Sequence, residues 1–401
     1  MSLDIISPNF TEAHLNEIIK KKGGLRHTSW AFEGAAGKKG DGYLSEVYKL
    51  ILKGVDEKDE EFDVHLVIKT TPKSKGRRKT FRSSDFFRNE INFYNIILKE
   101  FDEFQEKKTQ AKNPFKEIAT CLAFHLDGEN DLLVLENLNN YGYHTRSRQE
   151  SMNINLCRLI MRTLGRFHGL SFVIRDQNPK LFETISEVLE ETYYAYRLKP
   201  WYNDFINMQI EVALDAVKKI YGGTIIEKRA KKFLNDGSLY DKMVELTHTR
   251  NCYSVIGHGD CWTPNFLIHS TKHEGQETPV KAKMIDFQLA RFASPVIDIS
   301  FFIYSCTTEE LRVQYYDDLI KKLPFKLNEL KTFFRFGVGM GIESIPFSTM
   351  EDNETADMDQ IIGDDAVPIT NIWILKEMEN MQDQHRLADI FKHASDCGYL
   401  D

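Results

Sequence analysis

The chain has 401 residues, of which 42% are hydrophobic, 12% aromatic and 28% charged, and its formal net charge is −8 at pH 7. This length allows one large domain or two smaller ones, with a substantial core. The acidic balance argues against a general nucleic-acid-binding protein, which needs a basic surface. It does not argue against a phosphate-bearing ligand, because such a site needs only local positive charge.

The N-terminal stretch MSLDIISPNFTEAHL lacks the basic segment and apolar run of a signal peptide. No segment approaches the roughly 18 apolar residues of a membrane span. The six cysteines are scattered without a CxxC pair, which favours reduced thiols over a disulfide framework. We therefore expect a cytoplasmic chain with no membrane span, and the sequence does not indicate an oligomeric state.

Short β-type runs fill the first third of the chain. Residues 43–52 (YLSEVYKLIL) and 64–69 (VHLVIK) predict a hairpin with the acidic turn 56–63. The basic run 73–82 (KSKGRRKTFR) is interpreted as a solvated loop, with phosphate attraction as the alternative. Apolar residues within 85–100 then recur at helical spacing.

The pattern becomes mainly helical further along the chain. Residues 131–138 (DLLVLENL) predict a buried strand that runs into a connector, whereas 155–172 and much of 181–250 predict helices. We therefore predict an α+β, kinase-like fold with two lobes. The small β-rich lobe would be residues 1–138, and the larger helical lobe residues 139–401.

Two charged residues of the first lobe pose a burial problem. Glu90 lies at the edge of the apolar stripe of the 85–100 helix, and Lys69 ends the strand 64–69. An unpaired buried charge is costly, so each residue is a candidate partner of the other. Taken separately, a surface glutamate and a strand-end lysine are the simpler interpretation.

Glycines occur in two further stretches of interest. The segment 40–47 (GDGYLSEV) has the layout of the loop that covers phosphates in kinases, with Ser45 in place of the third glycine. Gly40 and Gly42 would let backbone amides approach phosphate oxygens, although a plain hairpin turn explains the segment equally well. The run GVGMG at 337–341 follows a helix-like segment, so we assign it to close packing or a helix end.

The stretch 255–268 (VIGHGDCWTPNFLI) places Asp260 and Asn265 in a bend between apolar runs. Their spacing equals that of a kinase catalytic loop, where the carboxylate accepts a hydroxyl proton and the amide oxygen coordinates Mg²⁺. A second hairpin, with the turn 270–279, is expected to return Asp286 beside Asn265. Two oxygen ligands so placed predict an Mg²⁺ site, and the alternative for the bend alone is a capped turn.

A protein kinase is disfavoured by the same region. Gly259 stands where the catalytic loop of a protein kinase has arginine, and only a short segment separates Asp286 from Pro295, with no APE motif. A peptide-docking activation loop does not fit there. A small-molecule acceptor is therefore expected.

The chain resembles the ecdysteroid-kinase-like family of the kinase superfamily over about residues 30–320. The segments GHGDCWTPNFLI (257–268) and MIDFQLARFASPVIDISFFIYS (284–305) carry the specific part of the resemblance. The segments GDGYLSEVYK, FFRNEINFY and LVLENL also fit. Gly42 departs from the asparagine that members often have there, and Leu44 from a small residue, which puts the detailed loop conformation in question.

The resemblance implies roles for individual residues. Lys69 would bind the α- and β-phosphates of ATP and Glu90 would hold it. Asp260 would be the catalytic base. The remaining implied ligands are Asn265 and Asp286 for Mg²⁺, and the backbone around Glu136 and Leu138 for the adenine edge.

Other polar and aromatic residues receive structural interpretations. Asp298 is expected to hydrogen-bond the backbone of the 258–265 loop, and His258 and His168 are expected to be packed and hydrogen-bonded. The aromatic segment 191–206 is interpreted mainly as core, with an acceptor pocket as the alternative. Trp262, close to Asp260, is the better pocket candidate, although it too can be packing.

The implied activity is ATP- and Mg²⁺-dependent phosphorylation of a hydroxyl group on a small lipophilic alcohol, by resemblance an ecdysteroid or another dietary or endogenous alcohol. A choline- or aminoglycoside-type kinase is a second possibility, and it would need an acidic or aromatic cage for a cationic acceptor. A non-catalytic nucleotide-binding protein is a third, against which the intact Asp260, Asn265 and Asp286 set argues. The expected partner is a small-molecule substrate and not nucleic acid.

Overall fold

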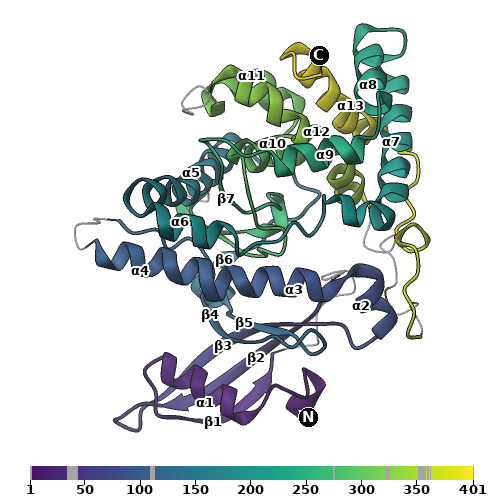
Figure 1. Ribbon diagram of the computed structural model, residues 1–401. Coiled ribbons are helices and arrows are strands. Elements are labelled where there is room, and N and C mark those ends of the chain that lie inside the picture. Colours follow the sequence, from purple (N-terminus) through teal and green to yellow (C-terminus); the bar gives the residue numbers. More distant parts are fainter. Residues whose placement is uncertain are drawn as a thin grey trace.

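The computed structural model describes residues 2–33, 44–108, 113–273, 276–320, 326–350, 358, 361 and 363–400. Its N-terminal part holds a five-stranded antiparallel sheet in the order β1-β2-β3-β5-β4 (Figure 1). The strands are β1 (Arg26–Phe32), β2 (Glu46–Val55), β3 (Glu61–Thr70), β4 (Cys121–His125) and β5 (Leu132–Glu136). The predicted hairpin is confirmed as β2 and β3. Its turn is shorter than predicted, because pairing continues to Val55 and Glu61.

The sheet lies between two helical layers, with α1 (Glu12–Lys21) on one face and α3 (Ser83–Asn92) on the other (Figure 1). Alternate residues of β3 point to opposite faces. Leu66 and Ile68 pack with α1 in one core cluster. Val67 and Lys69 therefore point to the opposite face, where they line a cavity. The two-residue period of the strand thus directs Lys69 toward α3.

The basic run 73–82 is not a loop. Lys75–Phe81 form a short helix, α2, which begins where the Ser74 hydroxyl accepts a hydrogen bond from the Arg77 amide. Phe81 is fully buried, so capping and burial of this side chain outweigh the density of charge. Arg82, at φ +54°, separates α2 from α3.

The predicted helix 85–100 is confirmed and is longer than expected. It consists of α3, a π-helical turn η2 (Phe93–Leu98) and α4 (Lys99–Lys107). The apolar side chains of this continuous helix pack under the sheet and against the helical part of the chain. Glu90 lies on its buried face.

Helices dominate the remainder of the described chain (Figure 1). The twelve residues of α10 (Pro295–Cys306) are all buried, as expected of a helix that is apolar on every side. The other helices of this part are α5 (Ile154–Gln177), α6 (Pro179–Ser186), α7 (Lys199–Tyr221), α8 (Ile225–Asn235), α9 (Leu239–His248), α11 (Glu309–Ile320), α12 (Leu327–Thr349) and α13 (Met381–Asp396).

The GVGMG run at 337–341 lies inside α12, so the assignment to a helix end was wrong and the assignment to close packing was right. A Cβ atom at Gly337 would come within 2.4 Å of the Ser300 carbonyl oxygen. This glycine lets α12 approach the backbone of α10. Five short helical turns complete the described helices: η1 (Leu3–Ile5), η3 (Leu138–Tyr141), η4 (Tyr196–Leu198), η5 (Thr263–Asn265) and η7 (Ile369–Asn371).

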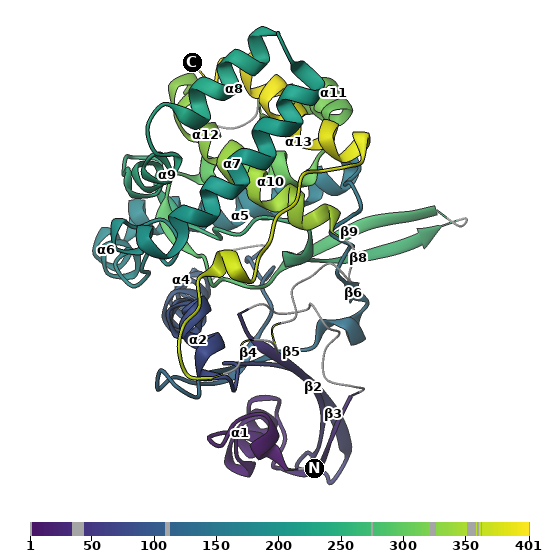
Figure 2. The ribbon, with the colours of Figure 1, turned by 90° about the vertical axis from the view of Figure 1, so that its right-hand side faces the viewer.

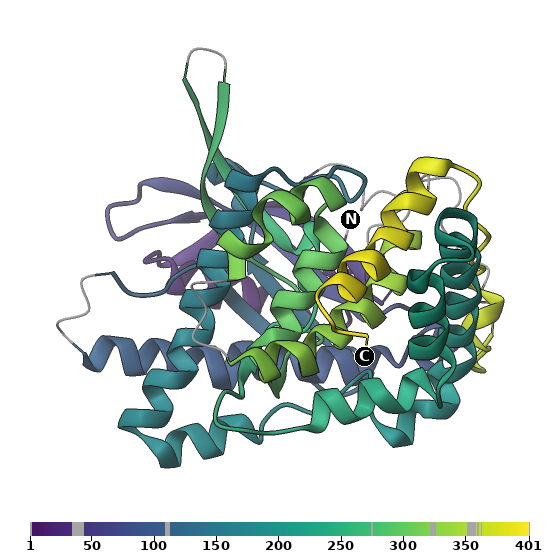
Figure 3. The same cartoon turned by 90° about the horizontal axis from the view of Figure 1, so that it is seen from above.

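Two small sheets lie between the large sheet and the helices. One joins β7 (Val255–Gly257) to β10 (Arg291–Ala293), and the other has the order β6 (Tyr143–His144), β8 (Phe266–His273) and β9 (Gln276–Met284). The β8–β9 hairpin projects from the body of the molecule (Figures 2 and 3). The predicted turn 270–279 was too long, because pairing continues to His273 and Gln276.

A C-terminal strap, residues 363–380, begins beside α2 and runs to α13 (Figure 2). The Gly76 amide donates to the Gly363 carbonyl oxygen at 3.0 Å, and the Val367 amide donates to the Thr80 hydroxyl at 3.0 Å. The strap therefore links α2 to the helical part. Among the helices of the described ranges, none combines the length and apolar character needed to cross a membrane.

Candidate active site

A cavity of about 660 Å³ lies between the sheet and the helical part. It is lined by all but one of the predicted site residues that the structure describes: Ser45, Lys69, Glu136, Leu138, Asp260, Asn265 and Asp286. The exception, Glu90, lies behind Lys69 and contacts it. Gly40 and Gly42 lie outside the described residues. Fold and topology thus bring together residues that are more than 200 positions apart.

Lys69 bridges two carboxylates in the cavity wall. Its Nζ lies 2.6 Å from Glu90 Oε2 and 3.0 Å from Asp286 Oδ1. Burial opposes the charge of the lysine, but Asp286 and Glu90 outweigh it and raise the pKa of Lys69. Burial raises the pKa of Glu90, and Lys69 works against this rise. The buried glutamate and the strand-end lysine are therefore partners, and the simpler interpretation as separate surface charges is wrong.

The bend 258–260 is held by Asp298 from α10. The two carboxylate oxygens of Asp298 accept hydrogen bonds from the His258 and Gly259 amides, each at 2.8 Å. His168 Nε2 lies 2.8 Å from the same carboxylate. Burial alone raises the pKa of Asp298, but these donors lower it to about 2. The predicted contact of Asp298 with the loop backbone is confirmed.

Gly259 is required by the local geometry. Its φ is +83°, and a Cβ atom there would lie 1.8 Å from the Leu289 carbonyl oxygen. The arginine of a protein kinase loop has no room at this position. His258 beside it is buried and packed as predicted: Nε2 donates to the Ile285 carbonyl oxygen at 2.9 Å, and Nδ1 accepts from the Asp260 amide at 3.2 Å.

Asp260 and Asn265 contact each other directly. Asn265 Nδ2 donates to Asp260 Oδ2 at 2.8 Å and to the Asp260 carbonyl oxygen at 2.9 Å. Burial raises the pKa of Asp260 to about 8, and the nearby Asp286 adds to the rise. Because Nδ2 makes both hydrogen bonds, Oδ1 of Asn265 is the atom suited to a cation.

Asp286 follows β9, and the Ile285 amide donates to the Asn265 carbonyl oxygen at 3.1 Å. The hairpin thus brings Asp286 beside Asn265, as the sequence predicted. Its φ of +68° places it in the left-handed region that aspartate tolerates better than most residues. The described part of the chain holds no group of three or more His, Cys, Asp or Glu residues suited to a metal. A site of one carboxylate and one amide nevertheless fits Mg²⁺, which commonly takes few protein ligands together with substrate phosphates and water.

Glu136 and Leu138 form the connector between β5 and η3, at the edge of the cavity. The side chain of Glu136 makes an ion pair with Lys22 at 2.6 Å and accepts from the Tyr141 hydroxyl at 2.9 Å. Burial raises the pKa of this carboxyl, but Lys22 and Tyr141 outweigh the effect and lower it. The side chain of Glu136 is thus engaged by Lys22 and Tyr141. The backbone of this connector is the part that remains to contact a molecule in the cavity.

A further set of cavity-lining residues is called here the acceptor end and comprises Tyr193, Trp201, Trp262, Met340, Glu343, Phe347 and Trp373. Sequence reasoning largely missed this set. The aromatic segment 191–206 is divided: Tyr194 and Tyr202 are fully buried core, whereas Tyr193 and Trp201 line the cavity. Trp262 lines it too, as expected of the better candidate. The residues missed by the sequence are Met340, Glu343 and Phe347 from α12 and Trp373 from the strap. Nothing in their spacing connects them to the 258–265 loop.

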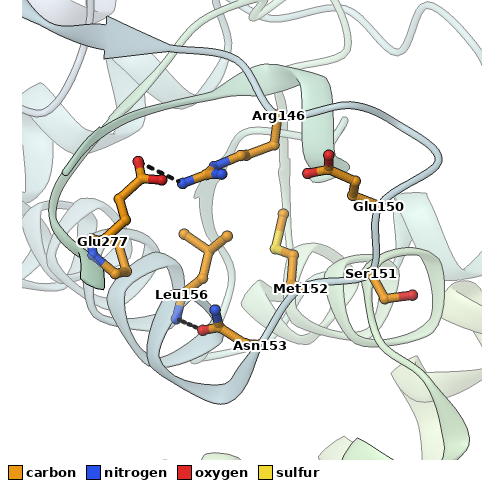
Figure 4. A pocket seen from close by; sticks show the side chains of 8 residues that line it. Arg146, Glu150, Ser151, Met152, Asn153, Leu156 and Glu277 are labelled. Atoms are coloured by element: carbon orange, nitrogen blue, oxygen red, sulfur yellow. Dashed lines mark hydrogen bonds and ion pairs between the residues drawn. The ribbon is translucent and has the colours of Figure 1, made fainter. Parts of the chain in front are cut away.

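A second cavity of about 180 Å³ lies beside the start of α5 (Figure 4). Arg146 and Glu277 make an ion pair of 3.1 Å across it, and Asn153 Oδ1 accepts from the Leu156 amide at 3.0 Å to cap the helix (Figure 4). These contacts are structural. The larger cavity is therefore the candidate active site.

The sheet with its lysine–glutamate pair, the Asp–Asn bend and the aspartate at the hairpin end together define a phosphotransferase of the kinase-like class. A family model described as "Ecdysteroid kinase-like family" matches residues 39–331, more than half of the chain. The chain belongs to this family. It is a small-molecule kinase that acts on hydroxyl groups.

Comparison with solved structures finds an aminoglycoside phosphotransferase and a choline/ethanolamine kinase family protein among its matches. The GDP complex of wild-type aminoglycoside 2'-phosphotransferase-IIIa has 12% identity and a TM-score of 0.41, with 84% of this chain and 91% of that chain covered. A choline/ethanolamine kinase family protein from Mesorhizobium loti has 12% identity and a TM-score of 0.39, with 90% and 92% covered. These TM-scores are too low to support any conclusion about this chain. The comparison with curated proteins finds no significant match.

Proposed function

We propose that this chain transfers the γ-phosphoryl group of ATP, with Mg²⁺, to a hydroxyl group of a small lipophilic alcohol, of the ecdysteroid type by its family. The observation that carries the proposal is the convergence of Lys69, Asp260, Asn265 and Asp286 on one cavity. The lobes in this proposal are residues 1–138 and 139–401, with the nucleotide between them. A cytoplasmic location is also proposed, and it is supported by the six cysteines, none of which forms a disulfide.

Asp260 is the general base of the proposed reaction. Its carboxylate accepts the proton of the acceptor hydroxyl as the acceptor oxygen bonds to the γ-phosphorus and the bond to the departing ADP oxygen breaks. The raised pKa of Asp260 supports this role, because a base titrating near the working pH transfers protons most effectively. Asn265 orients the carboxylate through its hydrogen bond to Asp260 Oδ2 and holds the Asp260 backbone through its hydrogen bond to the carbonyl oxygen.

The nucleotide is bound by the remaining predicted residues. Lys69, held by Glu90, contacts the α- and β-phosphates, and the segment with Gly40, Gly42 and Ser45 covers them. Two connector residues, Glu136 and Leu138, offer backbone groups to the adenine edge.

Asn265 and Asp286 are the proposed ligands of Mg²⁺. When bound, the ion neutralises charge on the β- and γ-phosphates. Lys69 Nζ lies 3.0 Å from Asp286 Oδ1, so the lysine and the proposed ion ligand stand at the same point of the cavity.

The lipophilic nature of the acceptor is supported by the tryptophan and phenylalanine side chains at the acceptor end of the cavity, including Trp201, Trp262 and Phe347. A choline- or aminoglycoside-type acceptor is the second candidate. One observation favours it: Glu343 lies among these aromatic residues, which gives a cationic acceptor an acidic partner.

The test is a transfer assay with radiolabelled ATP and three acceptor types: steroid alcohols, choline and aminoglycosides. Asp260→Asn is expected to keep ATP binding and to lower turnover by roughly 10²- to 10⁴-fold, the usual contribution of a general base. Asp63→Asn is the matched control, because this aspartate is exposed and lies on β3, far from the bend in sequence.

Two results would count against the proposal. Near-normal turnover in Asp260→Asn would remove this residue from the mechanism. Protein that binds Mg-ATP and phosphorylates no member of a broad alcohol library would instead indicate a non-catalytic nucleotide-binding protein.

A further inference from the structure

Glu343 presents a carboxylate to the acceptor end of the cavity from α12. Its Oε1 accepts a hydrogen bond from the Tyr193 hydroxyl at 2.5 Å. Its Oε2 is shielded from solvent and has no hydrogen-bond partner among the described residues. The Tyr202 hydroxyl also interacts with the Glu343 carboxyl and lowers its pKa, but it does not meet hydrogen-bond geometry at Oε2.

An acceptor atom in this situation is unusual in a folded protein, because nearly all buried polar atoms are hydrogen-bonded. Burial raises the pKa of Glu343 to about 7, and Tyr193 and Tyr202 oppose the rise. Among the described residues, the side chains that act on the pKa of Glu343 are those of Tyr193 and Tyr202, and no lysine or arginine is one of them. Glu343 Oε2 therefore lacks a hydrogen-bond donor, and a bound molecule can supply one.

Glu343 is also close to the proposed reaction centre. Glu343 and Asp260 line the same cavity, so a molecule bound at Asp260 occupies the cavity that Glu343 also lines. Tyr193, Trp201 and Phe347 line the same end and offer apolar surface to the skeleton of such a molecule. The pocket thus combines one hydroxyl-activating carboxylate, an apolar wall and a second carboxylate.

We propose that Glu343 is a specificity residue whose Oε2 accepts a hydrogen bond from a second polar group of the acceptor, distinct from the hydroxyl group that is phosphorylated. This inference rests on the proposed function and names its substrate class: lipophilic alcohols with a distal hydrogen-bond donor. The donor can be a hydroxyl or a protonated amine, since a carboxylate accepts from both. The aromatic side chains suit either source, as apolar wall or as cation–π partner.

Three matched probe series distinguish the two sources. They are 1-alkanols, α,ω-diols and ω-amino-1-alkanols of increasing chain length, which differ only in the terminal methyl, hydroxyl or ammonium group. Binding to the full chain without ATP is measured by calorimetry, so the result does not depend on phosphoryl transfer. One hydrogen bond to a charged partner is expected to give diols, amino alcohols or both a roughly 10- to 100-fold preference over the alkanol of equal length.

Substitutions at Glu343 identify the donor. Glu343→Leu is expected to abolish the preference. Glu343→Gln, which keeps a carbonyl oxygen, should retain a preference for the diol and lose one for the amino alcohol. Glu211→Gln, an exposed carboxylate on α7, is the matched control and should leave all affinities unchanged.

A purely structural role for Glu343 predicts different results. Tyr193→Phe removes the hydrogen bond to Oε1 but leaves Oε2 in place, so the preference should persist in this variant. Equal binding of the three series by the unsubstituted protein, no binding of any probe, or a preference that survives Glu343→Leu would overturn the inference. Probes that bind with the expected preference but receive no phosphoryl group would instead count against the proposed function.

Discussion

Replacing Asp298 with asparagine is expected to destabilise the protein and to displace the bend that carries Asp260. The carboxylate is buried and accepts from two backbone amides and from His168. Its pKa falls from an ordinary 3.8 to about 2, and each tenfold change in proton affinity corresponds to about 1.4 kcal/mol. The ionised form therefore contributes about 2 to 3 kcal/mol.

Asparagine also turns an NH₂ group toward backbone donors, which leaves at least one buried amide without a partner at a cost of about 1 to 3 kcal/mol. We expect Asp298→Asn to lower the free energy of unfolding by about 3 to 5 kcal/mol, the usual effect of breaking a buried charged contact. The sign follows from the lowered pKa: this stability is present above the ordinary carboxyl pKa and is lost as the pH falls toward 2.

Urea unfolding at pH 7, followed by fluorescence and circular dichroism together, measures the loss. The exposed Asp63→Asn should change the stability by less than about 0.5 kcal/mol. Turnover should also fall in Asp298→Asn, because the bend loses at least one of its two backbone anchors. A loss of stability below about 1 kcal/mol with unchanged turnover would show that the Asp298 contacts do not hold the bend.

Two further substitutions test the proposed nucleotide site and the bend. Lys69→Met should lower turnover by about 10²-fold or more, because it removes a preorganised cationic partner of the phosphates. It should also weaken ATP binding in a fluorescent-nucleotide titration. Binding equal to that of the unsubstituted protein would contradict the role of Lys69. Gly259→Ala should abolish phosphoryl transfer, because the alanine Cβ atom would lie 1.8 Å from the Leu289 carbonyl oxygen and φ at this position is +83°. The loss is measured by transfer assays on variant protein that has a native circular dichroism spectrum. Substantial activity would show that the bend can move without loss of function.

The residues nearest the proposed chemistry could be predicted from sequence because short-range structure places them. The Asp260 to Asn265 spacing lies within one bend, and the β8–β9 hairpin returns Asp286 beside it through strand pairing alone. Alternation along β3 decides which face Lys69 occupies, and helical spacing places Glu90 on the buried face of α3. Only their pairing required the tertiary structure.

Other parts depended on packing that no local pattern contains. Charge density in the run 73–82 suggested a loop, but the Ser74 cap and the burial of Phe81 produce a helix. Glu343 and Trp373 come from α12 and the strap, which reach the cavity only because α12 packs against α10 and the strap is tied to α2. Their role at the acceptor end therefore follows from the arrangement of whole elements.

The two ends of the cavity are built from different segments, and this has a consequence for specificity. The proposed phosphoryl-transfer residues are held by the large sheet, α3 and the 258–286 region, whereas the acceptor end is completed by the 193–201 segment, α12 and the strap. Substitutions such as those at Glu343 change the acceptor surface without touching the Lys69–Glu90 pair or the Asp298 contacts. Because the function of a fold depends on the residues at its site, acceptor preference can change here while the residues proposed for phosphoryl transfer stay the same.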